Sequence, residues 1–203
     1  MAQQSRGFPM KLGMMLVLGL AAVGDAGAGC APRSLYAEYR VTSSLLAHHT
    51  DSSVVVQLYR DGCIAITRPP HYVRPGHFAR QLDRAQFKAL EFEIQASGID
   101  RLASVDLVQR LQAKRNALPV GTPMHLVTDP DLIEFRLFVP GEVQPHALLR
   151  LSGLREDLLN LPDDPDLLAL ASLREAFEAL IDSSGAEVSP RKCGATGVLH
   201  GEF

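Results

Sequence analysis

Five residues that could contact a ligand lie in and beside one proline-rich stretch of the chain. They are Arg68, His71, Tyr72, Arg74 and His77. A loop that carries cations and an aromatic ring suits a peptide, a polysaccharide or an anionic component of a cell envelope. The three prolines in this stretch predict a loop, and loops carry binding residues more often than the scaffold does. We therefore expect a candidate binding loop here, with a plain solvated connection as the alternative.

A hydrolytic site would need an imidazole beside a carboxylate, and the sequence offers one way to build it. His71 or His77 would have to lie near Asp129 or Asp131, which come from a separate turn. The sequence contains no Gly-x-Ser-x-Gly elbow, and its one Ser-x-x-Lys lies outside the expected helices. We therefore expect no catalytic residue. A cavity that brings these histidines and aspartates together would favour the enzyme instead.

The seven histidines raise the question of a metal site. His48, His49, His71 and His77, with Asp51 nearby, lack the two ligand pairs at short spacing that zinc sites show. The acidic clusters lack the ligand pattern of a calcium-binding loop, and no glycine-rich phosphate loop follows the leader. We expect neither a metal nor a cofactor.

The start of the chain has the layout of a secretory signal peptide. Met10 and Lys11 precede an apolar run over residues 12–23, and small residues follow up to Cys30. A span of this length is too short for a permanent membrane helix, which needs about 20 apolar residues. We expect residues 1–30 to be the leader, with translation starting at Met1 or Met10, and the mature protein to be extracytoplasmic.

Two processing routes remain open at the end of this leader. Cleavage after Ala28 would follow the small-x-small rule, whereas Ala28-Gly29-Cys30 resembles a bacterial lipobox, with Gly27 as its departure from that pattern. The cysteine count favours the lipid, because acylation of Cys30 leaves Cys63 and Cys193 as a possible disulfide pair. We therefore expect Cys30 to be the lipidation site.

Size and charge exclude several kinds of partner and fold. Without the leader about 170 residues remain, which suits one domain with its own core. The formal net charge is -3, so no basic footprint for nucleic acid is present. Three cysteines are too few for a disulfide scaffold. The apolar core must therefore hold the fold together.

Alternating and helical hydrophobic patterns divide the mature chain into strands and helices. We expect a single domain over 31–182 and a flexible tail over 183–203. The expected strands cover 35–41, 54–60, 63–67, 78–82, 124–128, 132–139 and 147–151. The expected helices cover 83–97, 104–117 and 164–182. This order predicts an α+β fold, an antiparallel sheet with helices packed on one face.

Three finer expectations concern turns and helix faces. Asp61-Gly62 predicts a hairpin with a type I′ turn. In the second helix we expect Val105, Val108 and Leu111 to face the core, with the cationic residues on the solvated side. In the last helix the expected core stripe consists of Leu168, Leu173, Phe177, Leu180 and Ile181.

These features together give a resemblance. The order of four features resembles that of small bacterial secreted or lipoprotein domains of uncharacterised function. They are the strand with Tyr36 and Tyr39, the Asp61-Gly62 hairpin, the helix start at Leu82-Asp83 and the closing leucine-rich helix. The chain resembles this group over about residues 35–181. The resemblance implies the architecture and secretion, and no activity.

The sequence thus predicts a non-enzymatic extracytoplasmic domain with a binding or envelope-assembly role. We expect it in the periplasm, attached to a membrane as a lipoprotein if Cys30 is acylated. Its partner would be an envelope protein or another envelope component. The alternatives are a secreted hydrolase and an immunity or inhibitor protein.

Overall fold

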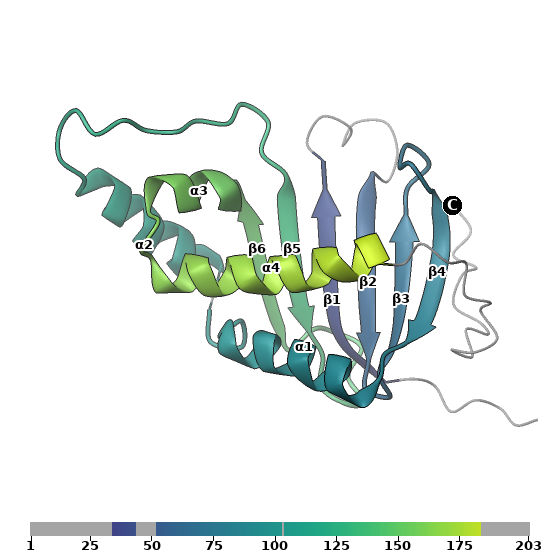
Figure 1. Ribbon diagram of the computed structural model, residues 1–203. Helices are drawn as coiled ribbons and strands as arrows, with labels where there is room; N and C mark the ends of the chain where they lie inside the picture. Colours follow the sequence, from purple (N-terminus) through teal and green to yellow (C-terminus); the bar gives the residue numbers. More distant parts are fainter. Residues whose placement is uncertain (1–33, 44–51, 103, 184–203) are drawn as a thin grey trace, which may run out of the picture.

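A computed structural model describes residues 34–43, 52–102 and 104–183 of the chain. Within them an antiparallel sheet of six strands and four helices form an α+β fold (Figure 1). The strands are β1 (Leu35–Thr42), β2 (Ser53–Tyr59), β3 (Cys63–Arg68), β4 (Gly76–Gln81), β5 (Leu132–Leu137) and β6 (Ala147–Ser152). The helices are α1 (Arg84–Ala96), α2 (Ser104–Asn116), α3 (Leu154–Asn160) and α4 (Pro165–Ser183). The predicted fold class is confirmed.

The sheet is built around β1, in the order β4-β3-β2-β1-β5-β6. Tyr39 in the middle of β1 pairs with Val56 of β2 on one side and Phe135 of β5 on the other. All three side chains are buried, since alternate residues of a strand point to the same face and this face carries the helices. The neighbouring pair, Glu38 and Gln57, lies on the opposite face.

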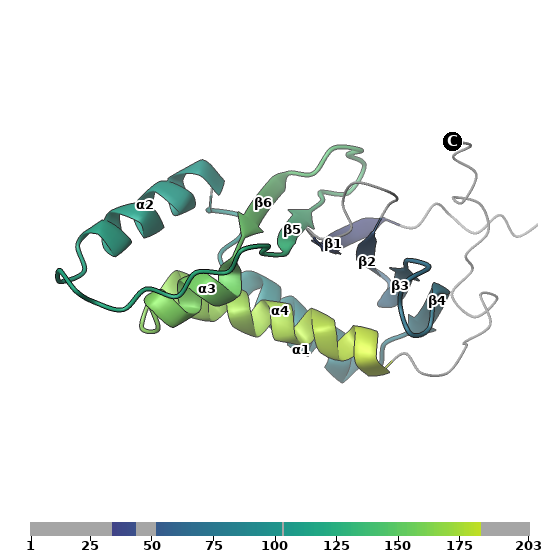
Figure 2. The ribbon, with the colours of Figure 1, turned by 90° about the horizontal axis from the view of Figure 1, so that it is seen from above.

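Helices cover one face of this sheet. Seen from above, α1, α3 and α4 lie on one side of it, and α2 lies beyond the edge formed by β6 (Figure 2). α1 begins at a capping box, in which the Asp83 carboxylate accepts a 2.8 Å hydrogen bond from the Gln86 amide. α4 begins at Pro165 and is capped by Asp164, whose carboxylate accepts from the Leu167 amide at 3.1 Å.

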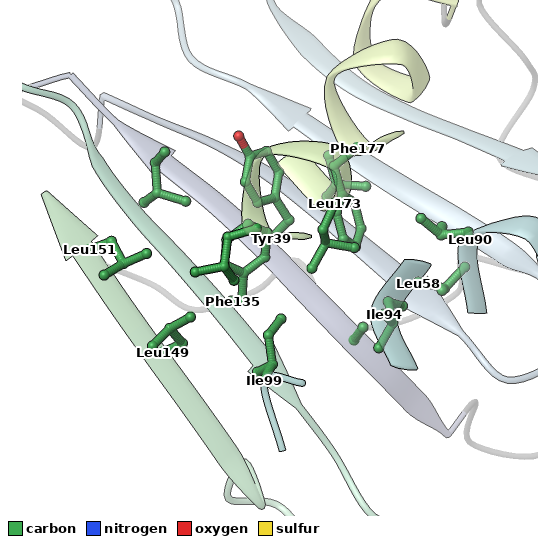
Figure 3. Packing of buried hydrophobic residues seen from close by; sticks show 14 of the residues in the cluster. Tyr39, Leu58, Leu90, Ile94, Ile99, Phe135, Leu149, Leu151, Leu173 and Phe177 are labelled. Carbon is green, nitrogen blue, oxygen red and sulfur yellow. The ribbon is translucent and has the colours of Figure 1, made fainter. Parts of the chain in front are cut away.

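The core lies between α4 and the middle of the sheet. The ring of Tyr39 stacks on Phe177 of α4 at 5.0 Å and packs against Phe135 at 5.1 Å. Figure 3 shows these rings among aliphatic side chains such as Leu149, Leu151 and Ile94, with the Tyr39 oxygen at the border of the cluster. The aromatic contacts fix how α4 crosses β1 and β5.

The structure differs from the sequence analysis in the segment between α2 and β5. Residues 117–131 form a long connection without a strand, so the strand expected over 124–128 is wrong. The reason is the buried side chain of Asn160 at the end of α3, a helix that the pattern did not predict. Its amide accepts from His125 N at 2.8 Å and donates to His125 O at 3.0 Å. The Asn160 side chain thus provides the backbone of His125 with the hydrogen bonds that a neighbouring strand would otherwise provide.

The expected apolar stripes of two helices are partly wrong. In α2 the buried residues are Leu107 and Leu111, whereas Val105 and Val108 are exposed. The cause is a set of ion pairs to the α3–α4 region: Arg110 with Asp166 at 2.7 Å, Arg115 with Asp157 at 2.8 Å, and Lys114 with Asp164. In α4 the expected Leu168 is exposed, whereas Leu180 is partly buried against the core as predicted. The buried set also contains Leu167 and Leu170, which the pattern did not predict.

The hairpin between β2 and β3 is present, but its turn is not type I′. Gly62 has a φ of 80°, whereas no residue other than glycine in the described ranges has a positive φ. The Gly62 amide donates to the Tyr59 carbonyl at 2.9 Å. A turn that closes on a left-handed glycine gives a bulged hairpin, so only one of the two residues needs that conformation.

Three expectations about the chain ends stay as predictions. The leader with Cys30 and nearly all of the tail lie outside the described residues, although Ser183 belongs to α4. Of the helices that the structure describes, none has both the length and the apolar content that a membrane crossing requires.

Candidate functional site

The antiparallel order of the strands brings several distant segments to one edge of the sheet. β1 and β3 end there and β2, β4 and β5 begin there, at the upper edge in Figure 1, and the C-terminal half of α4 crosses the strands below this edge. A cavity of about 370 Å³ lies at this place. Its lining consists of Val41, Ser43, Ser52, Val54, His71, Tyr72, Asp131, Arg174, Glu178, Ile181 and Asp182.

One cluster of polar groups in the lining is internally paired. Arg174 Nε donates a 2.7 Å hydrogen bond to Glu178 Oε1, one turn further along α4, and the Tyr39 hydroxyl donates to the same oxygen at 3.4 Å. Burial raises the pKa of the Tyr39 hydroxyl, and the Glu178 carboxylate raises it further. Burial alone would lower the pKa of Arg174, but the hydrogen bond and charge of Glu178 outweigh it, so the pKa is raised. Both groups therefore keep their protons at neutral pH.

The other polar groups of the lining have no such partners. The side chains of Asp131 and Asp182 are exposed, and neither accepts a hydrogen bond or forms an ion pair within the described residues. The charge of Asp131 nevertheless contributes to the raised pKa of Arg174. Ser52 is 3% exposed, and its Oγ has no hydrogen-bond partner. Leaving a buried hydroxyl unsatisfied costs about 1–3 kcal/mol. The cavity therefore has two exposed carboxylates in its lining, and the buried hydroxyl of Ser52, another lining residue, is unpaired.

Arg68, the first residue of the expected binding loop, has a structural role. Its side chain is buried, and Nη2 donates to the carbonyl oxygen of Ile181 near the end of α4. The guanidinium lies 4.6 Å from the centre of the Phe78 ring and 5.8 Å from that of Tyr72. Arg68 thus caps α4, because a cation is stabilised near the last carbonyl oxygens of a helix. It also positions Tyr72, because a guanidinium is attracted to the face of an aromatic ring.

The structure divides the remaining residues of that loop. His71 and Tyr72 line the cavity, while Arg74 is exposed and outside the lining. His77 lies on the other face of the sheet from Phe78, and its Nδ1 is 3.0 Å from Thr67 Oγ1. Two of the five expected residues, His71 and Tyr72, therefore line the cavity, and the Arg68 guanidinium lies near the Tyr72 ring without lining the cavity.

The geometry that a hydrolase would need is only partly present. His71 and Asp131 line the same cavity, whereas Asp129 and His77 do not. Within the described residues His71 has no hydrogen bond to Asp131 or to a serine of the lining. A base that is neither oriented by a carboxylate nor joined to a nucleophile lacks the contacts that activate it.

Sequence reasoning did not identify Ser52, Arg174, Glu178 and Asp182. Arg174 and Glu178 show the spacing of an ordinary ion pair on a helix surface, which is common outside binding sites. No local signal marks Ser52. These residues become a site only because α4 crosses the sheet above the start of β2.

The metal and disulfide expectations have different outcomes. Among the described residues no group of three or more histidines, cysteines or acidic residues could hold a metal ion. His48, His49 and Asp51 lie outside those residues. Cys63 is buried and disulfide-bonded. Cys30 and Cys193 also lie outside the described residues, so the pairing of Cys63 with Cys193 remains a prediction.

The face of the sheet opposite the helices carries a second polar group. Glu134 accepts from Arg136 Nη2 and Arg150 Nε, each at 2.6 Å, and Glu38 accepts from Gln57 at 3.0 Å. Burial would raise the pKa of Glu134, but the two arginines outweigh it and the pKa is lowered. The Glu134 and Glu38 carboxylates therefore each accept a hydrogen bond from a residue on a neighbouring strand, Arg150 and Gln57 respectively. Such cross-strand pairs stabilise a sheet.

Comparison with known proteins assigns no family to the chain. No protein-family description matches the sequence, and no curated protein is detectably similar to it. Any function must therefore be argued from the geometry of the molecule itself.

Proposed function

We propose that this chain is a non-enzymatic, extracytoplasmic binding domain, and that the cavity beneath the C-terminal half of α4 is its binding site. The partner is an envelope protein or another envelope component, as the leader implies. A secreted hydrolase is the competing function, because His71 and Asp131 both line the cavity.

The observation that carries the proposal is the division of polar groups in the cavity. Arg174, Glu178 and the Tyr39 hydroxyl hold one another in place. Within the described residues the side chains of Asp131 and Asp182 accept no hydrogen bond and form no ion pair, and Ser52 Oγ has no hydrogen-bond partner. A fixed frame that presents unpaired polar groups beside apolar residues is the arrangement of a recognition site. Catalysis would require an oriented base and nucleophile in addition.

The position of the cavity suits a protein tethered through its N-terminus. If Cys30 carries a lipid, four residues separate it from Leu35, where β1 begins. Eight residues of strand extend about 25 Å. The cavity lies at the other end of β1, beside Val41 and Ser43. A lipid anchor would thus leave the cavity facing away from the bilayer and accessible to a partner.

The binding proposal is tested by amide NMR of the mature protein against a panel of small molecules. The panel contains separate cationic, anionic, neutral polar and apolar compounds. Shifts that cluster at Ser52, Tyr72, Asp131 and Ile181 for any one class support a binding site in the cavity. Shifts confined to other surfaces, or none with any class, overturn it.

The competing hydrolase is tested with chromogenic ester and amide substrates on the wild type and on His71→Ala. We expect no turnover by the wild type above the buffer rate. Turnover that His71→Ala abolishes, with His77→Ala unchanged as the matched control, would replace the binding proposal by the enzyme.

The localisation is tested in cells with the full chain, wild type and Cys30→Ser. We expect the wild type in the membrane fraction and its precursor to accumulate when globomycin blocks the lipoprotein signal peptidase. We expect Cys30→Ser to lose membrane attachment. A wild type that is fully soluble and processed normally in globomycin would overturn the lipid anchor and leave plain cleavage after Ala28.

A further inference from the structure

We propose that the ligand of the cavity is an organic cation on an apolar stem, namely an alkylammonium or guanidinium group of the size of a lysine or arginine side chain. The inference rests on the proposed binding function and specifies its ligand. Neither the sequence pattern nor the comparisons assign this chemistry.

The charges of the lining exclude an anion and favour a cation. Asp131, Glu178 and Asp182 contribute three carboxylates, and Arg174 is the one Lys or Arg residue among the lining residues. Arg174 is already paired with Glu178 at 2.7 Å. Asp131 also acts on Arg174 through its charge, so the lining has an excess of carboxylates over cations and not two isolated ones. A further positive charge within a few ångströms of Asp131 and Asp182 is stabilised.

The end of α4 adds to this potential. The last turn of a helix exposes carbonyl oxygens with a partial negative charge, and cations are favoured there. α4 has no basic residue in its last turn and carries Asp182 instead. Arg68 caps the Ile181 carbonyl from the side of β3, but it does not line the cavity, and Asp182 has no partner within the described residues.

The apolar part of the lining suits the stem of such a ligand. Val41, Val54 and Ile181 supply aliphatic surface, and Tyr72 adds an aromatic ring. Methylene groups gain about 0.8 kcal/mol each on burial against such surface. The ring of Tyr72 is held by Arg68 on one side and can attract a second cation. A volume of about 370 Å³ is at the lower end of the range for small-molecule sites, so one side chain or small amine fits better than a large ligand.

Ser52 supplies an observation that is independent of the carboxylates. Ser52 lines the cavity and is 3% exposed, and its hydroxyl oxygen has no hydrogen-bond partner. Native structures rarely leave such a group unpaired, and a ligand is one reason for an exception. An ammonium or guanidinium N–H is a strong donor to a hydroxyl oxygen, so a bound cation removes the deficit.

The test is a calorimetric titration of the mature protein with N-acetyl-lysine methylamide and with its Nε-acetylated form, which has the same stem without the charge. We expect binding of the charged compound and at least tenfold weaker binding of the neutral one. n-Pentylamine distinguishes the source: equal affinity indicates a free amine, and tighter binding of the lysine compound indicates a partner side chain. Either result supports the cation.

The matched variants are Asp131→Asn and Asp182→Asn, with Asp129→Asn as the control outside the lining. Each of the first two should weaken binding about threefold to tenfold, because each removes one attractive charge. Asp129→Asn should leave affinity unchanged. All three positions are exposed, so thermal melts should remain within about 2 °C of the wild type.

The outcomes separate this inference from the proposed function. Binding of a neutral or anionic compound in the cavity, with no preference for the cation, overturns the inference and leaves the binding function intact. Binding of the cation that Asp131→Asn and Asp182→Asn do not affect also overturns it. If no class of compound binds, both proposals fail.

Discussion

Arg174 and Glu178 form a hydrogen bond of 2.7 Å across one turn of α4, directly above the Tyr39 hydroxyl. Glu178 is the main counter-charge of Arg174, and Asp131 acts on the same guanidinium more weakly, so the lining holds three carboxylates against one cation. An ion pair with the ordinary helical spacing of four residues thus affects the charge balance of the cavity lining.

Ser52→Ala should separate stability from binding. Removal of a buried hydroxyl without a partner should leave the free energy of unfolding unchanged or raise it by about 1 kcal/mol, because a desolvation cost disappears. The same change should weaken binding of N-acetyl-lysine methylamide about threefold, since one hydrogen bond is lost. Urea unfolding and calorimetry measure the two effects. A clear loss of stability would show that Ser52 is engaged in the free protein.

Arg68→Met should destabilise the fold, although Arg68 belongs to the expected binding loop. The change keeps most of the apolar stem but removes the donor to the Ile181 carbonyl and the charge near the rings of Phe78 and Tyr72. We expect a loss of about 2–3 kcal/mol, the size of a buried charged hydrogen bond. Arg155→Met, at an exposed position of α3, is the control and should change stability by less than about 0.5 kcal/mol. Equal effects of the two changes would contradict the capping role.

The elements that could be predicted from the sequence are those with local causes. Asp83 and Asp164 accept hydrogen bonds from the first turns of α1 and α4, as their positions predicted. Alternation of apolar residues in β1 and β5 predicted the face that carries the helices, where Tyr39 and Phe135 lie. Glu38 and Glu134 on the opposite face are buried as well.

The features that the sequence could not predict depend on contacts between segments that are far apart in the chain. The expected strand over 124–128 is replaced by a loop because Asn160, 35 residues beyond His125, satisfies its backbone. The contact between Arg68 and the Ile181 carbonyl could not be predicted, because nothing near Arg68 in the sequence indicates that it caps α4. The cavity draws its lining from segments as far apart as Val41 and Asp182, so composition alone could not have assembled it.

Asp164→Asn should reduce stability at neutral pH and have no effect in strong acid. Burial would raise the pKa of Asp164, but hydrogen bonds from Lys114 and from the backbone amides of Leu167 and Asp166 outweigh it, so the pKa is lowered. The stability that its ionised form contributes is therefore complete above the ordinary aspartate pKa of about 3.9 and is lost as the pH falls through the lower folded value. Asparagine can still cap α4, so the change removes mainly the ion pair to Lys114.

Unfolding of the wild type and Asp164→Asn should be compared from pH 7 to pH 2. We expect the variant to be about 1 kcal/mol less stable at pH 7 and the difference to vanish near pH 2. Asp163→Asn, an exposed neighbour, is the control. A difference that is independent of pH would show that the charge of Asp164 is not the cause.

Ser104→Ala should make the β6 edge of the sheet available for pairing. The Ser104 hydroxyl donates to the Leu148 carbonyl at 3.2 Å and accepts from the Arg150 amide at 2.9 Å, and so covers backbone groups of an edge strand. We expect a loss of about 1 kcal/mol and more self-association on size-exclusion chromatography at high concentration. Ser172→Ala, which removes a bond between two helices, should not self-associate. Monomeric behaviour of both variants would contradict a protective role of Ser104.

The central claim is that a ligand enters the cavity beneath α4, and intermolecular NOEs test it most directly. With N-acetyl-lysine methylamide bound to the mature protein, we expect NOEs from the ligand methylenes to the methyl groups of Val41, Val54 and Ile181, which line the cavity. NOEs only to methyl groups on other surfaces, such as those of Val108 on α2 or Val143 beyond β5, would contradict the account.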